Sequence, residues 1–86
     1  MKKLKFLKEG DRFYHFIYTE DKEYMIEREE SKGPYKAWWH VYRKEADGLY
    51  HTVMSPYFKL RADAINWVCE NYYPGYRPQK KLEKFN

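Results

Sequence analysis

The stretch that decides the fold is KAWWHVYRK at residues 36–44, followed by EADG at 45–48 and LYHTVMS at 49–55. Aromatic and β-branched residues favour strands, and Asp47-Gly48 is a strong signal for a tight turn. The pattern therefore predicts a β-hairpin. A three-residue loop over 46–48, with a left-handed Gly48, pairs Glu45 with Leu49.

That register sorts the side chains of the hairpin onto two faces, because successive residues of a strand point to opposite sides. One face collects apolar side chains suited to a core, namely Ala37, Trp39, Val41, Leu49 and Val53. The other, which we call the outer face, collects Trp38, His40, Tyr42, Lys44, Tyr50, Thr52 and Met54. A four-residue loop would mix polar and apolar side chains on both faces, so the shorter loop is favoured.

Two further strands are expected before this hairpin. Residues 12–19 (RFYHFIYT) are rich in aromatic and β-branched side chains, and residues 24–30 (YMIEREE) alternate in polarity. With Tyr24 and Ile26 facing inward, Glu27 and Glu29 join the outer face. The segment Leu4-Lys5-Phe6 also alternates and offers a short fifth strand at the edge of the sheet.

One helix is expected over residues 61–73. Its apolar side chains recur at three- and four-residue spacing, which makes a single stripe of Ala64, Ile65, Val68, Cys69 and Tyr72. Asp63 suits the positive end of the helix dipole, and Pro74-Gly75 ends the helix. Ser55-Pro56 offers an alternative start.

These elements predict an α+β fold, a four-stranded antiparallel meander packed on one C-terminal helix. We expect a single ββββα domain over residues 1–76 and a basic extended tail over residues 77–86. Residues 1–12 carry five basic and two acidic side chains and residues 77–86 carry four and one, whereas residues 13–76 hold eight basic and ten acidic ones. The basic character of the chain is therefore concentrated at its two ends.

The composition excludes several classes of protein. The 86 residues include one Cys, which rules out an internal disulfide framework, and charged residues interrupt every apolar run well before the ~20 residues of a membrane helix. We therefore expect a soluble, cytoplasmic protein that does not act at a membrane.

No catalytic or metal-binding signature is present. His15, His40 and His51 fall on three different predicted strands, and the register puts His40 and His51 on opposite faces. Cys69 lies on the apolar stripe, where a buried thiol behaves as a small hydrophobic group. We expect a protein that is not an enzyme and has no catalytic residues, metal site or cofactor.

The outer face is the candidate binding face, through Trp38, His40, Tyr42, Lys44, Tyr50 and Thr52. Three roles are open for it: stacking against nucleic-acid bases, forming the centre of a protein interface, or only stabilising the sheet through cross-strand pairs. The two carboxylates count against nucleic acid but not against a protein partner, which would be a host protein or a second copy in a homodimer. Such a module suits a phage or mobile-element accessory protein that acts as an inhibitor or adaptor.

In the alternative, a DNA- or RNA-binding module, the phosphate contacts would come from Arg43, Arg77, Lys80 and Lys81. Residues 24–73 support this alternative through the WWHVY strand at 38–42, the Asp47-Gly48 turn, Phe58, and RADAINW at 61–67 opening the helix. This order resembles the arm-type DNA-binding domains of phage and transposon tyrosine integrases, which share the AP2-like fold. The resemblance implies a three-stranded sheet on one helix, whose outer face enters the major groove. The family's sheet is usually basic and polar, whereas Glu27, Glu29 and Glu30 stand on the first strand here.

Overall fold

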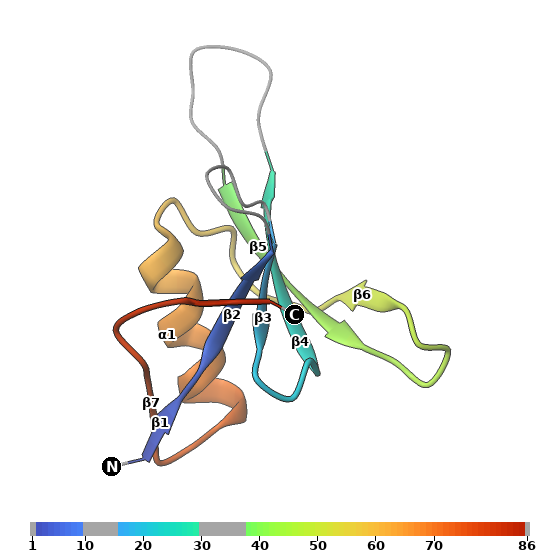
Figure 1. The fold of residues 1–86 in the computed structure, drawn as a ribbon. Coiled ribbons are helices and arrows are strands. Elements are labelled where there is room, and N and C mark those ends of the chain that lie inside the picture. Colours follow the sequence, from blue (N-terminus) through green and yellow to red (C-terminus); the bar gives the residue numbers. More distant parts are fainter. Residues whose placement is uncertain (1, 10–15, 30–37, 86) are drawn as a thin grey trace.

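The computed structural model describes residues 2–9, 16–29 and 38–85. It is a small α+β domain in which one helix, α1 (Arg61–Tyr72), covers one face of a twisted six-stranded sheet (Figure 1). In spatial order the strands are β6 (Tyr50–Thr52), β5 (Trp38–Lys44), β4 (Tyr24–Glu29), β3 (Phe16–Thr19), β2 (Phe6–Glu9) and β8 (Glu83–Lys84). Neighbouring strands are antiparallel except β2 and β8, which are parallel. A second sheet pairs β1 (Lys2–Leu4) with β7 (Tyr76–Pro78) in parallel.

The β5–β6 hairpin has the predicted register. Lys44 pairs with Tyr50, and the Glu45 N–H donates to the Leu49 carbonyl at 2.9 Å. Gly48 has a φ of 82°, a left-handed conformation that glycine adopts at little cost. The prediction of a three-residue loop is therefore confirmed.

The core forms where the apolar stripe of α1 meets the inner face of the sheet. Ile17, Ile26 and Val41 are direct neighbours across β3, β4 and β5, and each is at most 1% exposed. Against them pack the predicted helix residues, of which Ala64, Ile65, Val68 and Cys69 are buried. Tyr72 completes the stripe by stacking on Tyr24, with 4.2 Å between the ring centroids. The predicted helix face is confirmed.

The predicted core position of Leu49 is wrong, because its side chain is 63% exposed. The β5–β6 hairpin extends beyond α1 and leaves the inner side of its tip without a covering layer (Figure 1). The fourth strand is also shorter than the predicted 49–55. Ladder pairing ends after Thr52, and the chain rejoins β5 only through an isolated bridge between Phe58 and Trp39. Pro56, which has no N–H to donate, lies in this interruption.

The predicted four-stranded meander is too small, because both ends of the chain add strands. Leu4-Lys5-Phe6 was expected at most as one edge strand, but β1 and β2 flank Lys5, and β2 lies between β3 and β8. Residues 77–86, expected as an extended tail, contribute to β7 and form β8, and Leu82 packs against the core. The chain after α1 runs back beside β1 and crosses to the far edge of the sheet (Figure 1). These parallel pairings join distant segments, so no local pattern announces them.

The start of α1 differs from one of the two predicted starts. Helix α1 begins at Arg61, with Leu60 as its N-cap, so Ser55-Pro56 is not its start. The predicted strand segments at 12–15, 30 and 36–37, together with Ala37 and His15, lie outside the described residues. No helix in the described part of the chain is long and apolar enough to cross a membrane.

Candidate functional site

The six residues of the candidate binding face lie on one side of the sheet, opposite α1. Cross-strand pairing sets Tyr42 beside Thr52 and Lys44 beside Tyr50, with Trp38 and His40 at alternate positions further along β5. Lys44 and Thr52 are exposed, whereas Trp38, Tyr42 and Tyr50 are half-buried and His40 is buried. The face is therefore partly closed rather than open.

Tyr57 is the side chain that lies over His40. Its ring centroid is 4.3 Å from that of His40, and the ring centroid of Tyr42 lies 5.2 Å from that of His40. Tyr57 comes from the interruption between β6 and the Phe58 bridge, and its own side chain is 55% exposed. A partner at this face would thus contact Tyr57 and Tyr42, with His40 beneath them.

Two carboxylates stand among these rings. Glu27 pairs with His40 across the strands, and Glu29 pairs with Trp38. The Tyr42 hydroxyl donates to Glu29 Oε1 at 2.8 Å, and His40 Nδ1 lies 3.9 Å from the same oxygen. Burial raises the pKa of Tyr42 well above its ordinary value, and the adjacent carboxylates raise it further. Tyr42 therefore remains a neutral donor at physiological pH.

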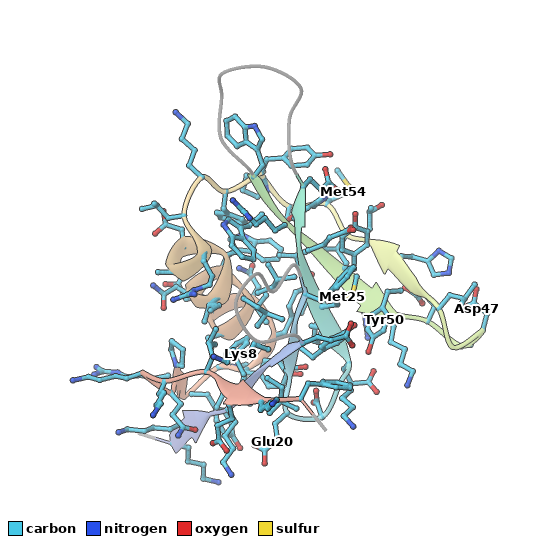
Figure 2. The ribbon with its side chains drawn as sticks, turned by 45° about the horizontal axis from the view of Figure 1, so that its top comes forward. Lys8, Glu20, Met25, Asp47, Tyr50 and Met54 are labelled. Atoms are coloured by element: carbon cyan, nitrogen blue, oxygen red, sulfur yellow. The ribbon has the colours of Figure 1, made fainter. Side chains whose placement is uncertain are left out.

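A second aromatic group, which the sequence did not reveal, extends the outer face towards β8. Tyr18 of β3 contacts Tyr50 and Phe85, with ring centroids 5.7 and 4.7 Å apart, and Lys22 Nζ lies 4.8 Å from the Phe85 centroid. The Tyr50 hydroxyl donates to the carbonyl oxygen of Lys22 at 2.6 Å. Met25, which pairs with Tyr18 and Tyr42, is 9% exposed although it is on the outer side. Figure 2 places Met25 and Tyr50 on the part of the sheet that leads to the Asp47 turn.

This second group could not be found from the sequence because it depends on β8. The backbone N–H of Phe85 donates to the Lys8 carbonyl at 2.9 Å, which holds the C-terminal segment beside β2. Only this pairing brings the Phe85 ring to Tyr18. The alternation of Phe16, Ile17 and Tyr18 was the one available signal, since it puts Tyr18 opposite Ile17.

Among the described residues, His40, His51 and Cys69 lie on three different elements or faces of the fold. His40 is on the outer face, whereas His51 pairs with Arg43 on the inner side and donates a hydrogen bond from Nε2 to Asp47 Oδ2 at 2.9 Å. Cys69 is 2% exposed, and burial, followed by the charge of Glu70, raises the pKa of its thiol to about 11. Within residues 2–9, 16–29 and 38–85, no cluster of three His, Cys, Asp or Glu side chains suited to a metal ion is found.

The four predicted phosphate contacts divide between two places. Arg43 lies over the ring of Tyr24, with its guanidinium carbon 5.8 Å from the ring centroid. Arg77 and Lys80 instead line a groove between α1 and the chain that follows it, and Lys81 is exposed next to Lys80. Two of the four residues, Arg77 and Lys80, therefore line one groove.

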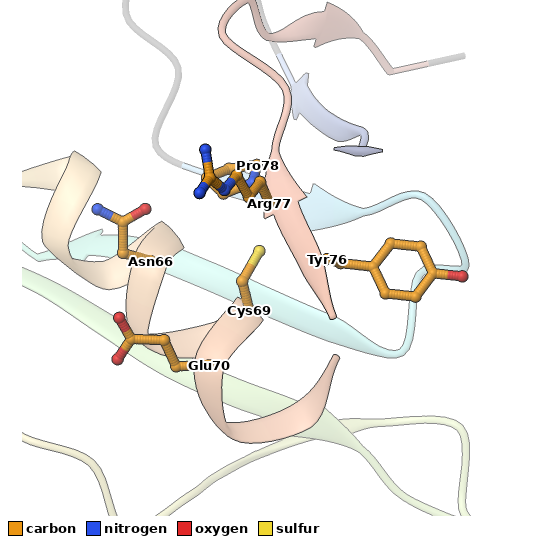
Figure 3. Close-up of a pocket in the computed structure, with 6 residues that line it drawn as sticks. All are labelled: Asn66, Cys69, Glu70, Tyr76, Arg77 and Pro78. Carbon is orange, nitrogen blue, oxygen red and sulfur yellow. The ribbon is translucent and has the colours of Figure 1, made fainter. Parts of the chain in front are cut away.

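This groove consists of two adjoining hollows of about 530 and 220 Å³ that share Asn66 and Pro78. Figure 3 shows the larger hollow, with Asn66, Cys69 and Glu70 on the helix and Tyr76, Arg77 and Pro78 on β7. The smaller one is lined by Arg61, Ala62, Ile65, Asn66, Pro78, Gln79, Lys80 and Leu82. We call the two together the helix groove.

Comparisons with protein-family models, curated proteins and solved structures gave no match to this chain.

Proposed function

We propose that this chain is a non-enzymatic protein-binding module, and that its outer face receives a basic side chain, arginine in preference to lysine, from the partner. The partner is a host protein or a second copy of the chain. The observation that carries the proposal is the position of Glu27 and Glu29 among the half-buried rings of the outer face.

The acidic pair retains capacity for a further donor. Glu29 accepts one hydrogen bond from Tyr42, and its side chain is 39% exposed. An ionised carboxylate has about four lone-pair sites on two oxygens, so most of them remain for another group. Partial burial lowers the local dielectric and strengthens the attraction to a cation above its value in bulk water.

The surrounding rings favour a guanidinium over other cations. Arginine can donate two parallel hydrogen bonds to a carboxylate and can stack its plane on an aromatic ring. On β5, Trp38 and Tyr42 flank His40, which pairs with Glu27. The ring of Tyr57 lies over His40. Half-buried Trp and Tyr side chains are also the residues that most often dominate the energy of protein interfaces.

The AP2-like alternative would place DNA on this same face. The elements that this alternative would use are β4, β5 and β6 with α1 behind them, within a sheet of six strands. However, Glu27 and Glu29 would then face a polyanion, and like charges oppose such an approach. For this reason we prefer a basic protein partner at the outer face.

The experiment is an NMR titration of the 15N-labelled chain with short capped peptides that differ in one central residue, Arg, Lys or Glu. The Arg peptide should shift the backbone signals of Glu27, Glu29 and Tyr42, the Lys peptide should shift them less, and the Glu peptide should not shift them. Glu29→Gln removes the charge but keeps the size of the side chain, and should weaken binding of the Arg peptide roughly tenfold. Asp63→Asn, on the exposed first turn of α1, is the matched control.

Shifts of equal size with the Glu peptide, or an Arg peptide that perturbs only residues outside the outer face, would contradict the proposal. Affinity capture with the wild-type chain and the Glu29→Gln variant in parallel then identifies the partner. A protein retained equally by both baits does not use this site.

A further inference from the structure

We infer that the helix groove binds single-stranded nucleic acid. The groove lies on the helix side of the molecule, so this site is separate from the outer face. The groove has basic walls and a partly apolar floor.

The walls are basic and come from separate parts of the chain. Arg61 stands at the start of α1, Arg77 on β7, and Lys80 in the turn that follows β7. The one acidic side chain among the lining residues is Glu70. Cations on several elements along a groove suit a polyanionic backbone, and phosphates bind such cations with release of counterions.

Further cations lie directly beside the groove. The register of the small sheet sets Lys2 beside Tyr76 and Lys3 beside Arg77, and both lysines are exposed. Lys81 adds another exposed charge next to Lys80. Of the acidic residues nearest in sequence to these cations, Glu83 is in an ion pair with Lys5 at 3.7 Å, and Asp63 lies in the first turn of α1 with Arg61. Positive charge therefore extends past both hollows, onto the small β1–β7 sheet and the chain after β7.

The floor of the groove favours a ligand that has flat apolar groups between its charges. The half-buried Pro78 and Leu82 supply apolar surface, and the amides of Asn66 and Gln79 can exchange hydrogen bonds with the edges of bases. A single strand presents bases and phosphates in turn, whereas a duplex keeps its bases stacked inside. An acidic peptide would satisfy the cations but leave this floor without a matching group.

The experiment is fluorescence anisotropy with labelled 12-nucleotide single strands of DNA and RNA, measured at about 50 and 200 mM salt. A duplex of the same sequence and a poly-glutamate peptide are the comparison ligands. If Arg61, Arg77 and Lys80 each neutralise one phosphate, the affinity for a single strand should fall about 20-fold between the two salt concentrations. Single strands should bind more tightly than the duplex and the peptide, and the comparison of DNA with RNA shows whether the 2′-hydroxyl is recognised.

Charge removal tests the position of the site. Lys80→Ala and Arg77→Ala should each weaken binding roughly eightfold at 50 mM salt, since each removes one counterion-releasing contact. Lys44→Ala removes an exposed cation from the outer face and should leave the affinity unchanged. Far-UV circular dichroism and thermal unfolding verify that all three variants are folded.

The inference is overturned by any of three results. These are no binding of single strands at 50 mM salt, equal or tighter binding of the duplex or the peptide, and an equal loss of affinity in Lys44→Ala. The last result would show that net charge, and not the helix groove, attracts the ligand.

Discussion

The hydroxyl of Tyr73, one residue past α1, contacts both carboxylate oxygens of Asp21 in the turn between β3 and β4, at 2.8 and 2.9 Å. These two residues are far apart in the sequence, and their hydrogen bond ties the end of the helix to the end of the sheet. Asp21 also accepts a hydrogen bond from the Thr19 hydroxyl at 2.7 Å and another from the Glu23 N–H at 3.0 Å. The carboxylate is thus the point at which the turn and the helix are joined.

We expect Tyr73→Phe to lower the free energy of unfolding by about 1–2 kcal/mol, because it removes a hydrogen bond to a charged group. Urea denaturation at neutral pH measures this difference. Tyr57→Phe, which changes an exposed tyrosine in the same way, is the control and should change the stability by less than about 0.5 kcal/mol. Equal stability of Tyr73→Phe and the wild type would show that the contact with Asp21 does not hold the helix.

The same carboxylate predicts a loss of stability in acid. Burial raises the pKa of Asp21, but the hydrogen bonds from Thr19, Glu23 and Tyr73 outweigh burial and lower it below its ordinary value. Because the folded pKa is below the unfolded one, Asp21 stabilises the fold above the unfolded value of roughly 3.9, and this stabilisation is lost as the pH falls through the folded pKa. In Asp21→Asn the difference in stability between pH 6 and pH 2 should be smaller than in the wild type. An identical pH profile for the two proteins would refute the assignment.

The structure predicts different stability effects for Ile26 and Leu49, two aliphatic residues that the sequence assigns to the inner face of the sheet. Ile26 is 1% exposed at the centre of the sheet, so Ile26→Ala should destabilise the fold by about 2–5 kcal/mol through lost burial and a cavity. Leu49→Ala, at the uncovered hairpin tip, should cost less than about 0.5 kcal/mol. Chemical denaturation of both variants tests the pair. A large loss in Leu49→Ala would mean that the tip is covered after all.

The C-terminal segment is expected to contribute to stability and not to behave as a tail. Deleting residues 82–86 removes the partly buried Leu82, the ladder of β8, and the ring of Phe85 against Tyr18. We expect the free energy of unfolding to fall by an amount on the order of 2 kcal/mol or more, measured by thermal and urea unfolding. Lys81→Ala, an exposed neighbour, is the control. A truncated chain as stable as the full one would contradict the packing of β8.

Much of the local structure could be predicted because it depends on short-range rules. The alternation over residues 38–44 and the turn at Gly48 specify a hairpin and its register, since a slip of one residue would reverse every side chain. The stripe through Ile65 and Val68 likewise identifies the buried side of α1. The position of Glu27 and Glu29 on the outer face follows from the same alternation, and the structure has both there.

The covering of the outer face by Tyr57 could not be predicted, because residues 53–60 show no strand or helix periodicity. Pro56 interrupts the ladder after β6, and the chain then carries Tyr57 across His40. His40, which the sequence places on the outer face, is consequently only 7% exposed. It lies beneath the ring of Tyr57. Strand periodicity assigns a side chain to one side of a sheet, but it does not say what lies over it.

The sequence alone therefore determined an α+β domain, its central hairpin, the buried face of its one helix and the acidic residues of its outer face. Each of these follows from steric and hydrophobic preferences between residues that are close together along the chain. Only the tertiary structure decided that the two ends pair in parallel, that Phe85 reaches Tyr18, and that Arg61, Arg77 and Lys80 line one groove. These contacts join segments that are far apart along the chain. They stabilise the fold only after the core has formed, because bringing distant segments together costs loop-closure entropy.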